Sequence, residues 1–354
     1  MTVANALLIT RDETLLDDVL RLAAAAGTVL DVAHDAVSAM RSWSTAATVL
    51  VGSDQAELVA GQHPARREQV HVVGRAPVCD SLFRAALEVG ATAVVELPAS
   101  EAWLVELLTD VVDGGGRPAT TIGVVAGSGG AGASTFACAL AVTASSRSRA
   151  LLLDLDPLGP GADQVIGLDE VSGVRWDSLV DSSGRLGSRS LRAALPQKGG
   201  LAVLTWGVGE ARQLQQASVR EVLAAAQRGN DVVVADLPRH LDGITVEVLG
   251  RCDHVVLVSA LTVPGVAAAG RVAAQLRGAT AHLHLVTRGR AGGVLPDQVA
   301  DTLGLPLLAV MPDQKRLAEH IDLGLGPVHA RRGPLARAAR TVCEGLLPPV
   351  PVAA

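Results

Sequence analysis

The stretch GVVAGSGGAGAST, residues 123–135, decides the fold of the longer part of the chain. Its apolar start predicts a buried strand, and its four later glycines predict a loop that leads into a helix. A phosphate-binding loop, G-x-x-x-x-G-K-[ST], has this order of elements. Gly127 and Gly132 occupy its glycine positions, and Ser134 occupies the hydroxyl position that holds Mg²⁺. Ala133 stands where the lysine that holds phosphate is expected.

Without its lysine, the loop still offers backbone N–H groups and a helix N-terminus to a phosphate. The missing charge-assisted contact is worth about 1.5–3 kcal/mol, or roughly 10- to 150-fold in affinity. We therefore expect weak binding of ATP with Mg²⁺, and slow or no hydrolysis. The alternative is a tight turn that keeps its glycines for packing alone, so retention of the ligand stays open at this point.

Acidic residues follow two further apolar runs. Asp154 and Asp156 end the run ALLLDLDP, and Asp236 ends the run NDVVVADLP. The carboxyl ends of parallel strands face the ligand crevice of an α/β sheet. Carboxylate and hydroxyl oxygens suit Mg²⁺. The predicted metal ligands are therefore Ser134, Asp154 and Asp236.

Composition limits the other classes of function. The 354 residues include 49% hydrophobic and 19% charged residues, which is ample for packed cores. The net charge of −6 shows no excess of basic residues that would attract the phosphate backbone of a nucleic acid. No sequence-specific nucleic-acid partner is therefore expected. The four cysteines show no disulfide or metal spacing. No signal peptide or membrane span is apparent, so we predict a cytoplasmic protein that contacts membrane only through partners.

Two α/β domains are expected. Residues 1–112 alternate five strand-like runs with helices, which predicts a small parallel-sheet domain. The glycine-rich residues 113–119 form the expected linker. Residues 120–345 alternate again, with continuous apolar strands typical of a parallel sheet buried on both faces. Residues 346–354, which contain three prolines, are expected to be a frayed tail. Within the second domain, 170–200 is predicted to be a loop with short helices.

The second domain resembles the MinD/ParA group of deviant P-loop ATPases, whose loop reads K-G-G-x-G-K-[ST]. Ser128 and Ala133 stand at its two lysine positions, and the remaining loop residues match. The resemblance covers about residues 120–330. It implies an ATP site and a homodimer, and it places Asp156 on the water-orienting, catalytic acid. The nucleotide-binding residues that it implies are Gly127, Ser128, Gly129, Gly130, Ala131, Gly132, Ala133, Ser134, Thr135, Thr287, Pro312 and Asp313. Thr287 replaces a common adenine-reading asparagine.

The first domain is similar to a response-regulator receiver, a flavodoxin-like fold, without the receiver's chemistry. Thr10 and Arg11 stand where a receiver has acids, and Asp54 lies slightly beyond the phosphorylation position. A pseudo-receiver followed by a MinD/ParA-like domain resembles the CpaE/TadZ family, whose actinobacterial branch is described as septum-site-determining. This resemblance implies a spatial regulator of septum or Flp/Tad pilus-secretion machinery, recruited to the pole or septum by protein partners.

Two other functions remain open. One is an active ATPase that cycles between a monomer and an ATP-bound dimer, against which the missing lysines argue. The other, ranked last, is a small-molecule enzyme on the same scaffold, for which no further catalytic group is evident. The pair His282 and His284 lies on one face of a predicted strand, where sheet packing is favoured over a metal site.

Overall fold

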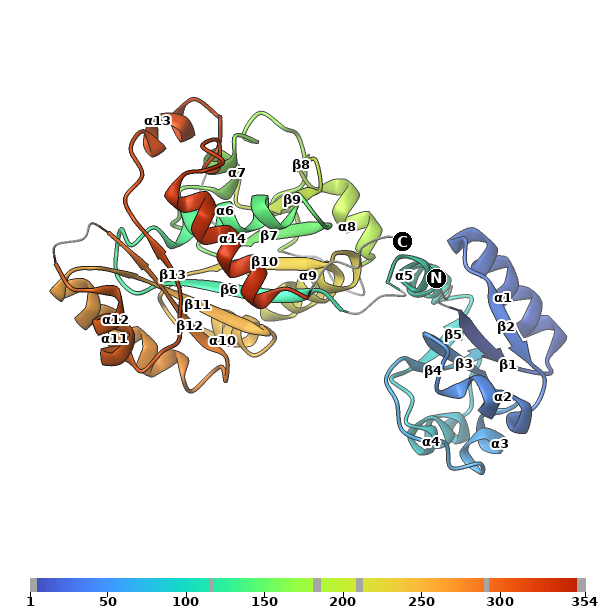
Figure 1. Ribbon diagram of the computed structural model, residues 1–354. Coiled ribbons are helices and arrows are strands. Elements are labelled where there is room, and N and C mark those ends of the chain that lie inside the picture. The colour runs from blue at the N-terminus through green and yellow to red at the C-terminus, as the bar shows by residue number, and fades with distance from the viewer. Residues whose placement is uncertain (1–4, 115–117, 181–185, 208–212, 290–292, 349–354) are drawn as a thin grey trace, which may run out of the picture. The chain divides into compact units, whose positions relative to one another are not determined.

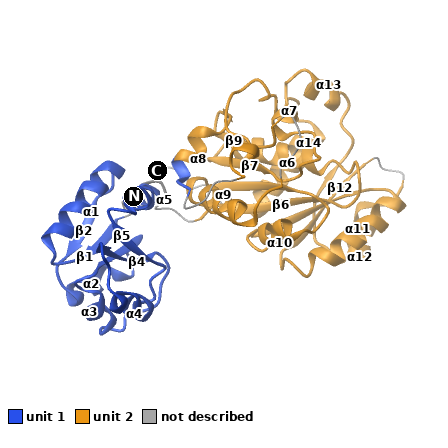
Figure 2. Cartoon of the chain, turned by 180° about the vertical axis from the view of Figure 1, so that it is seen from behind, with its two compact units in different colours: residues 1–117, 185–189 blue, residues 118–184, 190–354 orange. Residues whose placement is uncertain are grey.

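The computed structural model describes residues 5–114, 118–180, 186–207, 213–289 and 293–348 (Figure 1). It divides into two compact units (Figure 2). The first comprises residues 1–117 and 185–189, and the second comprises 118–184 and 190–354. Both units are α/β, as the sequence predicted. Within the described ranges, no helix is both long enough and apolar enough to cross a bilayer.

The first unit is a five-stranded parallel sheet in the order β2-β1-β3-β4-β5, with helices on both faces. One core cluster joins α2, α3 and α4 to the sheet, and the other joins α1 and α5 to it. The elements are β1 (Ala6–Ile9), α1 (Glu13–Ala26), β2 (Leu30–Ala33), α2 (Ala36–Trp43), β3 (Thr48–Gly52), α3 (Ala56–Ala60), β4 (Val70–Arg75), α4 (Asp80–Val89), β5 (Ala93–Leu97) and α5 (Glu101–Gly114).

Local chemistry sets the ends of these helices. The Asp12 carboxylate accepts hydrogen bonds from two backbone N–H groups at the start of α1. Gly27 ends that helix in the left-handed conformation, with φ 69°. Helix α5 continues to Gly114, two residues past the expected domain end at 112. The remaining linker residues 115–117 lie outside the described residues.

The second unit contains an eight-stranded sheet in the order β13-β12-β11-β6-β10-β7-β9-β8. All its pairings are parallel except that of β8 with β9. Its strands are β6 (Thr120–Ala126), β7 (Ala150–Asp154), β8 (Gln197–Lys198), β9 (Leu201–Leu204), β10 (Val232–Leu237), β11 (His254–Ala260), β12 (Leu283–Arg288) and β13 (Leu307–Met311).

Helices α6 and α14 pack on one face of this sheet in a single apolar cluster, and α9 to α12 lie on the other side (Figure 1). The helices are α6 (Ala133–Ala144), α7 (Ala162–Ile166), α8 (Ser188–Ala194), α9 (Gln216–Gly229), α10 (Gly243–Leu249), α11 (Val263–Leu276), α12 (Pro296–Leu303), α13 (Leu317–Asp322) and α14 (Pro334–Leu346), with a 3₁₀ turn at Trp176–Ser178.

The short strand β8 was not predicted, because two exposed polar residues carry no strand pattern. Residues 170–200 were expected to form a loop with short helices, and they contain the 3₁₀ turn and α8. Residues 181–185 lie outside the described residues. The expected tail begins where α14 ends, at Leu346, and its residues 349–354 also lie outside the described residues.

Candidate functional site

The glycine loop lies between β6 and α6, as its sequence predicted. Gly130 and Gly132 adopt φ values of 71° and 87°, which side chains rarely tolerate. Gly132 is the N-cap of α6, and Ala133 is the first residue of that helix. The loop therefore presents backbone N–H groups and a helix N-terminus at the carboxyl end of the central strand β6.

Two buried carboxylates lie directly beside this loop. Asp154 and Asp236 occupy paired positions on the neighbouring parallel strands β7 and β10. They are only 2% and 3% exposed. The Ser134 hydroxyl, on the first turn of α6, donates a hydrogen bond to Asp236. The structure thus brings together the three residues that the sequence proposed as metal ligands.

The electrostatics of this pair favour neutralisation of its charge. Burial and the neighbouring charge of Asp154 raise the pKa of Asp236 to about 8. Burial raises the pKa of Asp154 to about 6, although hydrogen bonds from Thr205, Ala162 and Asp156 act to lower it. In the described part of the chain, no lysine or arginine pairs with either carboxylate. A divalent cation near Asp236 would stabilise the charged form of both acids.

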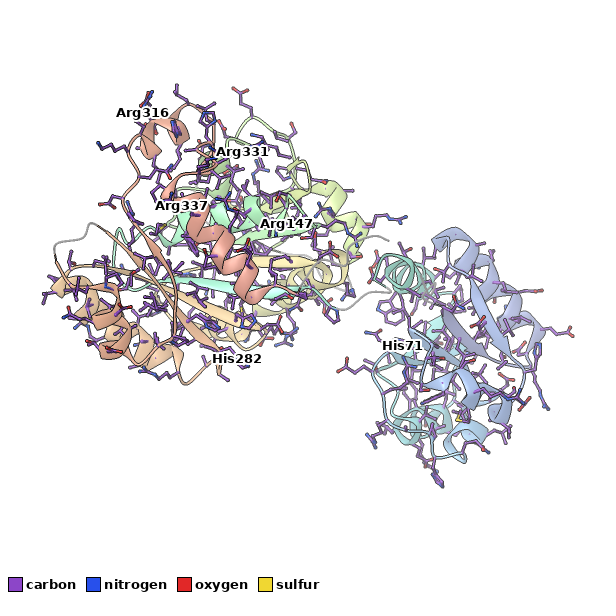
Figure 3. All side chains as sticks on the ribbon, in the orientation of Figure 1. His71, Arg147, His282, Arg316, Arg331 and Arg337 are labelled. Atoms are coloured by element: carbon purple, nitrogen blue, oxygen red, sulfur yellow. The ribbon has the colours of Figure 1, made fainter. Side chains whose placement is uncertain are left out.

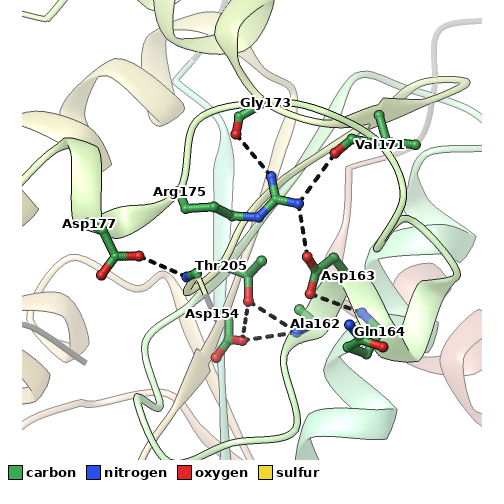
Figure 4. Close-up of polar contacts among 10 residues, drawn as sticks. Asp154, Ala162, Asp163, Gln164, Val171, Gly173, Arg175, Asp177 and Thr205 are labelled. Carbon is green, nitrogen blue, oxygen red and sulfur yellow. Dashed lines mark hydrogen bonds and ion pairs between the residues drawn. The ribbon is translucent and has the colours of Figure 1, made fainter. Parts of the chain in front are cut away.

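The donor set fits Mg²⁺ only in part. Asp236 and Ser134 offer oxygen ligands, which Mg²⁺ prefers together with water and phosphate oxygens. Asp154 is already engaged: its carboxylate accepts from the Thr205 hydroxyl at 2.7 Å and from the Ala162 N–H at 3.0 Å (Figure 4). Across the described ranges, no three His, Cys, Asp or Glu side chains converge as a ready metal site. Ser134 and Asp236 would thus hold the ion, while Asp154 accepts the hydrogen bonds from Thr205 and Ala162.

A polar network fixes the segment that follows β7 (Figure 4). The Arg175 guanidinium donates to the Asp163 carboxylate at 2.9 Å and to the carbonyl of Gly173 at 3.3 Å. The buried Trp176 indole donates to the Asp154 carbonyl at 2.7 Å. Sequence reasoning missed this network, since Arg175 and Asp163 belong to no motif and only folding brings them together. Its effect is to hold the backbone around Asp154 and Asp156.

Asp156, the predicted catalytic acid, lies in the turn after β7. One of its carboxylate oxygens accepts the Leu158 N–H at 3.1 Å, and its charge acts on Asp236. The residue is partly exposed. A carboxylate at this position is accessible to water and close to the pair of buried acids. Its role as the acid that orients water stays a prediction.

The remaining predicted nucleotide residues lie at the ends of β12 and β13. Thr287 is fully buried within β12. Pro312 and Asp313 follow β13 and are exposed. Asp313 forms an ion pair with Arg288 at 3.4 Å, and Arg288 also donates to the Gly130 carbonyl at 3.3 Å. Arg288 thus joins the β13 loop to the glycine loop. Sequence reasoning missed it because it is distant from the loop in the chain.

In the first unit, the Asp54 carboxylate accepts hydrogen bonds from three neighbours. The Thr10 hydroxyl and the Arg11 N–H donate to different oxygens of the Asp54 carboxylate, both at 2.7 Å. Gln55 adds a side-chain donor at 3.1 Å. Burial acts to raise the pKa of Asp54, but these hydrogen bonds together lower it.

The histidine pair has a third member. His284 and His254 approach to 3.3 Å between ring nitrogens, and the rings of His254 and His282 lie 5.8 Å apart. Burial first, and then the neighbouring imidazoles, lower the pKa of His284. The cluster lies where β11 and β12 begin, and Figure 3 labels His282. Among the described residues, no group of three or more His, Cys, Asp or Glu side chains is arranged to hold a metal ion, so sheet packing stays the prediction for this cluster.

Comparisons with known proteins extend over both units. The family model for the Rv3660c-like, CheY-like N-terminal domain matches residues 9–119. The uncharacterized proteins Rv3660c and MT3760 of two Mycobacterium tuberculosis strains are each 39% identical to the chain over 339 residues. That alignment covers 95% of this chain and 96% of each relative.

Solved structures with a similar fold cover the second unit. A ParA family ATPase from Chlorobium tepidum is 16% identical, with a TM-score of 0.58, over 64% of this chain and 97% of that one. The septum site-determining protein MinD from Pyrococcus horikoshii, solved with Mg-ADP, is 20% identical, with a TM-score of 0.54, over 64% of this chain and 95% of that one. These likenesses show the fold alone. The chain therefore belongs to the Rv3660c-like family, in which a CheY-like domain precedes a domain of the MinD/ParA fold, as the CpaE/TadZ resemblance predicted.

Proposed function

We propose that this protein is a spatial-regulation factor of the CpaE/TadZ type, which positions septum or pilus-secretion machinery. Its second unit binds ATP with Mg²⁺ weakly and hydrolyses it slowly or not at all. The bound nucleotide selects a homodimer, and the dimer recruits protein partners at the pole or septum. The first unit serves as a docking module.

The single observation that carries this proposal is the pair of buried acids beside a lysine-free glycine loop. Asp236 and Asp154 are held at the carboxyl ends of adjacent strands with no basic side chain of the described residues against them. A cation and the phosphates that accompany it would compensate this charge. With Ala133 in the lysine position, the loop lacks the contact that most stabilises the charge developing during hydrolysis.

The hydrogen bonds to Asp54 in the first unit support a docking role that does not depend on phosphorylation. A carboxylate whose two oxygens both accept hydrogen bonds is a poor acceptor for a phosphoryl group, because the transfer must break those to the oxygen that is modified: one from Thr10, or two from Arg11 and Gln55. The unit would then signal through its surface rather than through phosphorylation of Asp54.

A second candidate is an ATPase that cycles between a monomer and an ATP-bound dimer. Asp156 favours it, since this acid is partly exposed in the turn beside Asp236, where it would reach an attacking water. The proposed regulator and the cycling ATPase differ in their rate of ATP hydrolysis. A hydrolysis assay at saturating Mg-ATP therefore separates them. Turnover near one per second or above would favour the cycling enzyme.

The test of the proposed function combines localisation with binding. Fluorescent fusions of the wild type and of Ser134→Ala are expressed in the native cells at matched levels. We expect wild-type foci at poles or septa and a diffuse Ser134→Ala protein, because the variant loses the predicted Mg²⁺ ligand. Calorimetry of both purified proteins with Mg-ATP accompanies the imaging. Diffuse wild-type fluorescence throughout the cell cycle would contradict spatial regulation.

A further inference from the structure

A guanidinium group lies against the glycine loop, near the place where a loop lysine would act. Arg288 ends strand β12, and its Nη1 donates to the Gly130 carbonyl at 3.3 Å. The three heavy atoms nearest to a Cβ built on Gly132 all belong to Arg288. Ala133, which holds the lysine position, is the next residue. Arg288 is therefore placed beside this position from a different strand, 155 residues further along the chain.

The contacts of Arg288 position it without using all its donors. Its Nε lies 3.4 Å from an oxygen of Asp313, in the loop after β13. A guanidinium carries five N–H groups, and these two contacts engage the Nε–H and one Nη1–H. The side chain remains 33% exposed. The other N–H groups are available to an anion in the loop, in the planar arrangement that suits phosphate oxygens.

A second arginine approaches the other end of the loop. Arg239 follows β10, three residues after Asp236, and is exposed. Its Nη2 lies 3.9 Å from where a Cβ on Gly129 would be. In the described ranges, Arg239 has no ion pair. The loop is thus flanked by two guanidinium groups, from the ends of β10 and β12.

The charge around the loop shows why these arginines matter. Without them, the charged side chains that an incoming polyphosphate would meet among the described residues around the loop are carboxylates, and like charges close together are unfavourable. With them, the two cationic groups offset part of this repulsion before any metal ion arrives. The four carboxylates are Asp154, Asp156, Asp236 and Asp313.

We propose that Arg288 supplies, from within the same chain, the positive charge that the loop sequence lacks, and that its ligand is the polyphosphate of a nucleotide. Arg239 acts as a second donor near the mouth of the loop. This inference rests on the proposed function, because it names the residue through which the same site holds its nucleotide. It also accounts for a glycine at 132, since a side chain there would displace the guanidinium.

The test is calorimetric titration with Mg-ATP of the wild type, Arg288→Ala, Arg288→Lys and, as a matched control, Arg331→Ala. Arg331 is an exposed arginine of the same unit, outside the loop. We expect Arg288→Ala to bind about 10- to 150-fold more weakly. Arg288→Lys should retain most of the affinity because it keeps the charge, and Arg331→Ala should match the wild type. Thermal unfolding of each variant verifies that it is folded.

The outcomes separate the inference from the proposed function. If the wild type binds Mg-ATP and Arg288→Ala binds it equally well, the inference is wrong and the proposed function stands. If Arg288→Ala binds more tightly, Arg288 blocks the loop, and the inference is wrong in sign. If the folded wild type shows no binding at millimolar Mg-ATP, both fail.

Discussion

At the scale of single residues, the pKa values of two aspartates are shifted in opposite directions. Asp236 is buried beside another carboxylate, and its pKa is raised to about 8. Asp54 accepts hydrogen bonds from Thr10 and Arg11, and its pKa is lowered. The first arrangement favours neutralisation by a proton or a metal ion. The second stabilises the carboxylate with the protein's own donors, so it needs neither.

Replacing Asp54 tests this difference in the first unit. The Asp54→Ala variant leaves the Thr10 hydroxyl and the Arg11 N–H without their partner. Because solvent reaches this site, we expect the free energy of unfolding to fall by only about 1 kcal/mol, measured by urea denaturation. Glu88→Ala, which removes an exposed acid of α4, is the control. Labelling of wild-type Asp54 by acetyl phosphate and Mg²⁺ would contradict the proposed docking role.

At the scale of elements, the glycine loop is constrained by packing. A Cβ on Gly127 would lie 2.7 Å from the Cβ of Ala269 in helix α11, and 3.2 Å from the Val258 carbonyl oxygen. The first glycine of the loop is thus required for the approach of α11. Packing, one of the two explanations considered from the sequence, therefore applies to Gly127, while phosphate binding stays a prediction.

The packing role predicts coupling between Gly127 and Ala269. Gly127→Ala should lower the free energy of unfolding by about 1–3 kcal/mol through overpacking. Ala269→Gly should cost about 1 kcal/mol from lower helix propensity. We expect the double variant to be less destabilised than the sum of the two, because the smaller residue makes room for the new methyl group. Simple additivity in chemical denaturation would show that the contact is unimportant.

The histidine cluster of β11 and β12 predicts a pH dependence. The pKa values of His254 and His284 lie below the ordinary value of 6.5, mainly because of burial. The folded protein therefore binds fewer protons than the unfolded chain, and stability should fall as the pH drops below about 6.5. Asp253, next to His254 in the chain, opposes this shift.

Urea denaturation at pH 7 and pH 5 measures the effect. His284→Gln should reduce the stability lost between these two pH values, because it removes one of the imidazoles that must stay neutral. His240→Gln, at an exposed position, should leave that loss unchanged. Equal losses in the wild type and His284→Gln would assign the acid sensitivity to other groups.

At the scale of the whole molecule, each unit has its own cores. Among the described residues, three apolar clusters each draw their members from one unit alone. We therefore expect two transitions in calorimetry, and Mg-ATP at ten times its Kd should raise only that of the second unit, by about 3–5 °C. Val49→Asp places a charge in the core of the first unit, so the transition that it lowers is that of the first unit. A shift of both transitions by the nucleotide would contradict independent units.

Much of this molecule follows from local sequence. The alternation of strands and helices in both units was predicted, because continuous apolar runs between glycines and acids permit few alternatives. The glycine loop, Ser134 and the two strand-end acids could also be found, since motif spacing fixes them in one place. The strand β8 and the Arg175–Asp163 ion pair carry no such pattern, and they depend on contacts that form only in the folded chain.

The sequence by itself determined the α/β class, the order of the two domains, and the loss of both loop lysines. Each of these depends on residues near one another in the chain. Only the tertiary structure decided which charges surround the loop. It pairs Asp154 with Asp236 across two strands and brings Arg288 back onto the loop from a strand 155 residues away. The reason is physical: parallel strands place their carboxyl ends at one edge of the sheet, so distant residues become neighbours there.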